Sequence, residues 1–145
     1  MARLFKNQPV VDAGNLVLSS SELHDYTYWQ MFYGCTYLTT PPKKLPATTL
    51  AAGCYREMFK GCSSLNTPPI LPATTLADSC YGAMFWNCSS LTSITCLATD
   101  ISAASCITNW VYQISSTGTF KKSANMTSFP TGASGIPSGW TVIDV

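Results

Sequence analysis

Charged side chains are scarce in this sequence, with eight basic and seven acidic residues among 145. The basic residues are dispersed or form isolated pairs such as Lys43–Lys44, so no positive stripe could follow a phosphate backbone. We therefore expect no nucleic-acid partner. Serine and threonine are abundant instead, and a neutral, hydroxyl-rich surface is common among extracellular and virion proteins.

Long apolar runs are also absent. No segment reaches the roughly 20 apolar residues of a membrane span. At the N-terminus, Asn7, Gln8 and Pro9 interrupt the apolar residues that follow Arg3 and Lys6, which argues against a secretory signal peptide. We expect no membrane span. Either an export signal has been removed from the sequence or the protein reaches its place without Sec export, and a virion component released by lysis would need no such signal.

The usual elements of an active site are missing as well. The single histidine, His24 beside Asp25, lies near the start of the first repeat, where a cap or surface residue is more common than a general base. No glycine-rich phosphate loop appears. The carboxylates do not recur as pairs that could serve as acid and base; they are Asp12, Glu22, Asp25, Glu57, Asp78, Asp100 and Asp144. We predict that the protein is not an enzyme and takes no cofactor or metal. A small hydrolase would need His24 in a pocket with a serine and a carboxylate.

Cysteine, in contrast, is frequent: seven residues, an odd number for a disulfide framework. If the segment between Cys54 and Cys62 is helical, their separation is about 12 Å along the axis, beyond the Cα limit of about 7 Å for a disulfide. Cysteines of adjacent repeats would be about 8–10 Å apart. Buried thiols that act as small apolar groups are the favoured interpretation. A disulfide remains an alternative, and a zinc site a more remote one, because no C-x-x-C occurs.

The cysteines recur because the chain repeats. The stretch "LPATTLAAGCYREMFKGCSSL" (45–65) returns as "LPATTLADSCYGAMFWNCSSL" (71–91). Cys35 recurs as Cys62 and Cys88, at steps of 27 and 26, and Met31-Phe32 recurs with the same steps. A period in the twenties is typical of a leucine-rich-repeat-type solenoid. The sequence therefore predicts an α/β solenoid of about 3.5 repeats of 26–27 residues each.

Within one repeat, apolar residues at i, i+3, i+4 and i+7, such as Tyr28, Met31, Phe32 and Cys35, predict one face of a short helix. Gly34, Gly61 and Asn87 occupy the place of a helix C-terminal residue with positive φ. The following segments 37–42, 64–69 and 90–95 are expected to stack as short parallel strands opposite the helices, and the LPATTLA segment to return the chain.

The repeat becomes irregular toward the C-terminus. Leu97 and Cys106 stay in register, whereas Trp110-Val111 replaces Met-Phe. Phe120 falls where Ile94 fell, which predicts a fourth strand, and the Trp140–Val142 alternation predicts a closing one. The N-terminal segment lies outside the period. We accordingly divide the chain into a cap or attachment segment (1–21), the solenoid (22–114) and a C-terminal β cap (115–145).

When the copies of the repeat are aligned, some positions, here called columns, vary from copy to copy while the neighbouring positions stay constant. Positions that change inside a rigid period are expected to face solvent, and solenoids bind through such columns. Exposed Tyr, Trp and Arg are favourable interface anchors. The alternative is an ordinary solvated helix face. The candidate binding face comprises Trp29, Gln30, Tyr33, Arg56, Glu57, Lys60 and Trp86, with Gly82 and Ala83 at the same positions of the third copy.

The tandem "LPATTLAxxCYxxMFxGCSSL" unit, the segment "CLATDISAASCITNWV" and the terminal "GIPSGWTV" resemble the BspA-like leucine-rich repeat proteins of gut Bacteroides and their phages. The resemblance covers about residues 26–142. It implies a leucine-rich-repeat solenoid without catalytic residues, in a protein that is surface-exposed and adhesive or part of a phage particle. Two departures are the small number of repeats and the lack of an export signal.

Together these features predict a non-enzymatic recognition or structural module of a virion, at a fibre tip or as a capsid or tail decoration. Its partners would be a host-surface glycan or protein and, through residues 1–21, other virion proteins; a homo-oligomer is compatible with this role. The alternative is a fragment of an adhesin on a bacterial cell surface.

Overall fold

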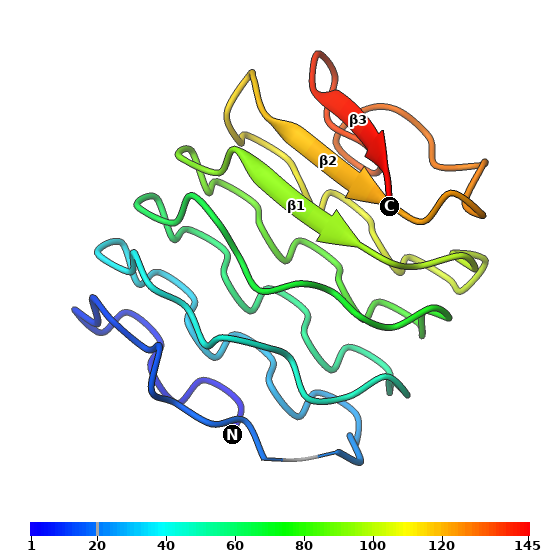
Figure 1. Ribbon diagram of the computed structural model, residues 1–145. Coiled ribbons are helices and arrows are strands. Elements are labelled where there is room, and N and C mark those ends of the chain that lie inside the picture. The colour runs from blue at the N-terminus through cyan, green and yellow to red at the C-terminus, as the bar shows by residue number, and fades with distance from the viewer. Residues whose placement is uncertain (20) are drawn as a thin grey trace.

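The chain winds into successive coils that stack on one another from the N-terminal to the C-terminal end (Figure 1). The computed structural model describes residues 1–19 and 21–145. Three short strands, β1 (Ser93–Cys96), β2 (Thr119–Lys122) and β3 (Thr141–Asp144), form a parallel sheet in the order β1-β2-β3. They lie side by side in the C-terminal coils of the stack (Figure 1).

The predicted α/β solenoid, with helices opposite strands, is wrong. The described residues contain no helix, and hence none long and apolar enough to cross a membrane. Where helices were expected, the backbone N–H groups alternate between two kinds of partner. The Met31 N–H bonds three residues back to the Tyr28 carbonyl (3.2 Å), whereas the Phe32 N–H bonds to the Met58 carbonyl of the next coil (2.9 Å). The segments are therefore runs of tight turns whose alternate N–H groups join neighbouring coils.

Every fourth residue of these turn segments has a left-handed backbone. In one segment Tyr26, Gln30 and Gly34 have φ of 59°, 53° and 70°. Such an angle at the third position of a four-residue turn is the mark of a type II turn. Gly61 and Asn87 also have positive φ, as their positions suggested, but inside a chain of turns and not at the end of a helix.

The four-residue repeat of these turns explains why the sequence suggested helices. In such a ribbon, residues i and i+4 lie on the same side, so Tyr28 and Phe32, and likewise Met31 and Cys35, all point inward and are buried. Over eight residues this pattern matches the i, i+3, i+4, i+7 spacing of an α-helix. The apolar positions were identified correctly, and their backbone conformation was not.

Regular strands develop on the opposite side of each coil only toward the C-terminus. Of the three segments expected to be strands, 90–95 overlaps β1, whereas 37–42 makes only the isolated bridge of Thr40 with Asp12, and 64–69 contains no strand. The strand expected at Phe120 is β2, in which Phe120 pairs with Ile94. The terminal strand expected from the Trp140–Val142 alternation begins at Thr141, and all four residues of β3 are exposed.

Aromatic rings run through the core at the coil spacing. The phenylalanine stack joins Phe5, Phe32, Phe59 and Phe85 with centroids 5.3–6.0 Å apart and nearly parallel planes. Beside it, the tyrosine stack consists of Tyr28, Tyr55 and Tyr81. Both stacks end at buried Trp110, 6.2 Å from Tyr81 and 6.3 Å from Phe85. Identical rings in contact are what a strict repeat in sequence produces.

The described part of the N-terminal segment (residue 20 lies outside the described residues) forms a coil of the stack, so the interpretation that this segment lies outside the period is wrong. Arg3, Phe5 and Asn7 donate their N–H groups to the coil that follows, at Trp29, Met31 and Tyr33. Phe5 extends the phenylalanine stack because it lies 27 residues before Phe32.

The register of the segment around Leu97 also differs from the prediction. Cys96, not Leu97, forms the bridge with Leu71, and Cys96 is buried like Leu71 while Leu97 is only half-buried. Ala98 is then buried in the place of Ala73, and Thr75 bridges to Asp100. In this stretch the third copy is thus one residue shorter than the period. One additional residue between Asp100 and Cys106 restores the register.

Candidate binding face

The outward side chains of the turn segments form a continuous surface, here called the turn face. Its most regular feature is a mixed column of cations and aromatic rings that crosses the coils. The Lys6 ammonium lies 4.7 Å from the Tyr33 ring centroid, and the Lys60 ammonium lies 5.7 Å from Tyr33 and 4.3 Å from Trp86. Tyr112 then meets Trp86 edge to face at 4.9 Å. Each outward side chain thus contacts the corresponding one of the next coil.

A second column is held together by Gln30. Its Oε1 accepts hydrogen bonds from Arg3 Nε (3.1 Å) and Lys6 Nζ (3.0 Å), and its Nε2 donates to Glu57 Oε2. Glu57 also forms an ion pair with Arg56 Nε at 3.8 Å. The Arg3 guanidinium lies over Trp29, 4.2 Å from the ring centroid. The amide therefore fixes two cations that belong to the N-terminal coil.

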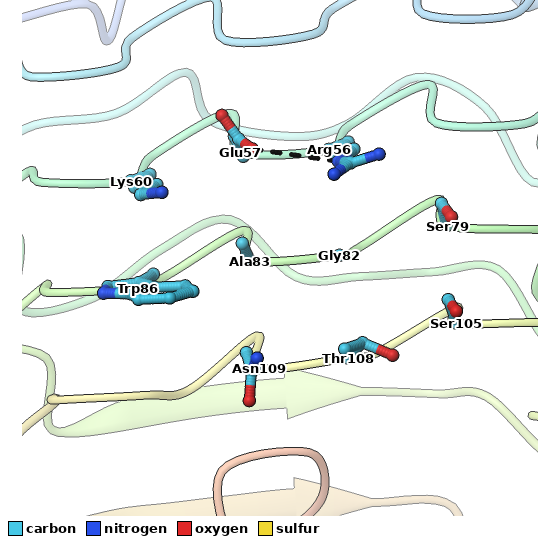
Figure 2. Close-up of a pocket in the computed structure, with 10 residues that line it drawn as sticks. All are labelled: Arg56, Glu57, Lys60, Ser79, Gly82, Ala83, Trp86, Ser105, Thr108 and Asn109. Atoms are coloured by element: carbon cyan, nitrogen blue, oxygen red, sulfur yellow. Dashed lines mark ion pairs between the residues drawn. The ribbon is translucent and has the colours of Figure 1, made fainter.

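A hollow of about 240 Å³ opens in the turn face where the residues of this second column are small. Gly82 and Ala83 stand where the preceding coil carries Arg56 and Glu57. In Figure 2, Arg56, Glu57 and Lys60 lie along one coil and Trp86 beside Ala83 on the next. The rest of the lining is neutral and polar, from Ser79, Ser105, Thr108 and Asn109.

The sequence-predicted face is brought together, but three positions of its variable columns are buried: Gln30, Gly82 and Ala83. Arg56 is exposed, and Trp29, Tyr33, Glu57, Lys60 and Trp86 are partly exposed. Gln30, which was expected to face solvent, is only 8% exposed, because it is enclosed by Arg3, Lys6 and Glu57. The turn face is a packed surface and not a row of free side chains.

Sequence reasoning missed the contributions of both ends. Arg3 and Lys6 lie 27 residues before Gln30 and Tyr33, and Tyr112 lies 26 after Trp86. Extending the period into the end coils, where few residues match the repeat, would have identified all three. Asn109 and Thr108 follow Ala83 and Gly82 at the same step of 26.

The prediction of buried thiols is confirmed: all seven cysteines are described, buried and free. Cys35, Cys62 and Cys88 each donate S–H to the carbonyl of a phenylalanine in the preceding coil, with Sγ to O distances of 3.0–3.1 Å. Burial raises the pKa of Cys54 to about 11 and the pKa of Cys88 to about 12. These thiols are unreactive internal groups because the thiolate is the reactive form.

The other candidates for chemistry lie outside the hollow. His24 is exposed, and its backbone N–H donates to the Thr27 hydroxyl in a local turn. In the part of the chain that the structure describes, no three His, Cys, Asp or Glu side chains gather as a metal site would require. The hollow is lined by one carboxylate, Glu57.

Comparisons of the chain with protein-family models, with curated proteins and with solved structures found no match. The chemistry of the turn face is therefore the basis for a proposed function.

Proposed function

We propose that this protein is a non-enzymatic recognition module that attaches its carrier to a host surface through the turn face. The observation that carries the proposal is the mixed column, in which Lys6, Tyr33, Lys60 and Trp86 contact one another in sequence across four coils. Tyr, Trp and Arg are the residue types most enriched among binding anchors. On this surface they lie beside a hollow with polar lining.

The coil stack gives this surface a fixed geometry. Alternate N–H groups of each turn segment bond to the next coil, and the aromatic rings beneath are stacked. A rigid surface loses little conformational freedom on binding. Weak contacts at each module add up when several copies are displayed together, since linked sites act at a high effective concentration.

The carrier in this proposal is a phage particle, at a fibre tip or as a capsid or tail decoration. The resemblance to BspA-like proteins of Bacteroides and their phages supports it. Residues 1–21 would dock to other virion proteins, and the N-terminal coil exposes four apolar side chains that suit such a contact: Met1, Leu4, Val11 and Val17. A bacterial cell-surface adhesin would use the turn face in the same way.

The test is attachment of the fluorescently labelled protein to Bacteroides cells, measured by flow cytometry. We expect the double variant Tyr33→Ala, Trp86→Ala to lose attachment, because both rings that orient Lys60 are removed. The matched control is Tyr37→Ala. Tyr37 is 64% exposed and lies outside the mixed column, so this variant should attach like the parent protein.

Folding of each variant is checked by its thermal unfolding midpoint. Undiminished attachment by a folded double variant would show that the turn face is not the binding surface. Equal loss with Tyr37→Ala would show that attachment depends on exposed aromatic side chains in general.

A further inference from the structure

We infer that the ligand of the turn face is an acidic glycan whose sugar rings carry carboxylates. This inference rests on the proposed function and specifies the ligand class of the same surface. Its basis is the distribution of charge, the way each cation is held, and the size and lining of the hollow.

Positive charge is concentrated on the turn face although the whole chain is nearly neutral. Four of the eight basic residues lie there, whereas Glu57 is the one acid among the columns described above. The four are Arg3, Lys6, Arg56 and Lys60. Asp25 and Asp78 lie at the start of two of the turn segments, and each accepts a backbone N–H of the following coil. The two columns therefore carry four cations against one carboxylate, while the carboxylates of Asp25 and Asp78 lie at the start of the turn segments and are engaged by backbone N–H groups.

Neutral groups hold most of these cations in place. Arg3 and Lys6 donate to the Gln30 amide oxygen, and Lys60 lies between the Tyr33 and Trp86 rings. Cation–π contacts of this kind orient an ammonium group without cancelling its charge. The ion pair of Arg56 engages Nε at 3.8 Å, and its side chain is 45% exposed. Its two terminal nitrogens therefore remain outside that pair, in the fork that suits a carboxylate.

The lining of the hollow favours a sugar. The hydroxyls of Ser79, Ser105 and Thr108 and the amide of Asn109 can exchange hydrogen bonds with sugar hydroxyls. The volume of about 240 Å³ lies below the roughly 300–1,000 Å³ of sites for drug-sized ligands, so it suits one ring at a time. The mixed column continues past the hollow toward Lys6, where a polymer would meet further cations.

Single-stranded nucleic acid fits this face less well. Its binding relies on aromatic faces on which bases can stack. Here Lys6 and Lys60 lie over Tyr33, and Lys60 and Tyr112 contact Trp86. The rings serve to position ammonium groups, and the anion must come to those groups.

The experiment measures binding of hexagalacturonate by calorimetry, with its methyl ester as the matched neutral ligand. We expect the acid to bind about tenfold or more tightly than the ester, since loss of one charge-assisted hydrogen bond corresponds to about a factor of ten. Arg56→Gln with Lys60→Gln should weaken acid binding by about the same factor. The control Lys43→Gln with Lys44→Gln, away from the turn face, should bind like the parent.

Sialyllactose and lactose serve as a second acid and neutral pair, and an oligothymidylate as the nucleic-acid arm. Equal binding of acid and neutral forms, tighter binding of the oligonucleotide, or no binding of either acid at millimolar concentration would overturn the inference. If the Tyr33→Ala, Trp86→Ala variant still abolishes cell attachment in that case, only the ligand class is wrong. If attachment persists, the proposed function fails as well.

Discussion

The two sides of one turn segment differ in what the repeat preserves. Inward, the phenylalanine stack carries the same residue in four successive coils, at Phe5, Phe32, Phe59 and Phe85. Outward, one residue further along, the mixed column reads Lys6, Tyr33, Lys60 and Trp86. Both columns have the coil spacing and both contain ring contacts. The residue type stays the same from coil to coil where the side chains are buried, and it varies where they are exposed to solvent.

This difference separates the side chains that stabilise the stack from those to which we assign recognition in our proposal. A buried ring must fit the ring above and below it, so one residue type is favoured at every coil. An outward side chain has fewer neighbours to fit, and a change from lysine to tryptophan alters the surface without disturbing the core. Neighbours in sequence such as Phe59 and Lys60 should therefore differ sharply in their effects when replaced.

The largest expected contrast is between Phe59→Ala and Lys60→Ala. Removing a buried ring from the middle of the phenylalanine stack should lower the free energy of unfolding by about 3–5 kcal/mol. Removing the Lys60 side chain forfeits partly exposed cation–π contacts and should lower it by only about 0.5–1 kcal/mol. Urea-induced unfolding of both variants measures the difference. Similar losses for the two would mean that the mixed column is part of the scaffold.

Alkaline pH should lower the stability of the fold through the buried thiols of the inward side. Burial raises the pKa of Cys54 to about 11, and that of Cys88 and of Cys96 to about 12, whereas the unfolded chain has ordinary thiol pKa values near 9. Above about pH 9 the unfolded state loses these protons first. Folded stability contributed by the neutral thiols is thus complete below that pH and declines as pH rises toward the folded pKa values.

For these three thiols the loss amounts to about 4 kcal/mol between pH 7 and pH 10. Burial also raises the pKa of Tyr55 and Tyr81, which acts in the same direction at higher pH. Unfolding midpoints in urea between pH 7 and pH 10.5 give the slope directly. The variant Cys88→Ala should show a shallower slope, whatever its stability at pH 7. A stability that stays level across this range would contradict the buried, protonated state of the thiols.

A smaller effect of opposite sign is expected in the tyrosine stack. The Tyr81 hydroxyl is buried and has no hydrogen-bond partner. A buried hydroxyl without a partner costs about 1–3 kcal/mol, so Tyr81→Phe should raise the free energy of unfolding by about 1 kcal/mol or more. Tyr28→Phe, at the other end of the stack, is the matched variant and should gain less. Calorimetric unfolding distinguishes the two, and a loss of stability in Tyr81→Phe would show that its hydroxyl is satisfied.

The sequence predicted the buried positions well because a residue type that recurs at the repeat period indicates a recurring structural environment. Tyr28, Phe32 and Cys35 recur for this reason, and all are buried. It failed on the backbone because a four-residue turn ribbon and a helix of 3.6 residues per turn place the same side chains inward over two turns. Only the left-handed residues at every fourth position differ, and most of them, such as Gln30 and Glu57, are not glycine.

The ends of the stack were hidden for a different reason. An end coil has a neighbour on one side only, so it keeps fewer of the repeated letters, and Phe5 is the clearest one in the first coil. The turn face was found from its variation, but its cations Arg3 and Lys6 were missed with that coil. The hollow was not foreseen, since it arises from small residues, Gly82 and Ala83, whose effect depends on the larger side chains around them.

In our proposal, attachment depends on the outward column, whereas stability depends on the inward one. The most direct test measures both quantities on two variants: Tyr33→Ala with Trp86→Ala, and Phe85→Leu. We predict that the first loses attachment to Bacteroides cells and keeps most of its thermal stability. The second should unfold at a lower temperature yet attach normally while folded. Normal attachment by the first, or loss of attachment by folded Phe85→Leu, would contradict the claim.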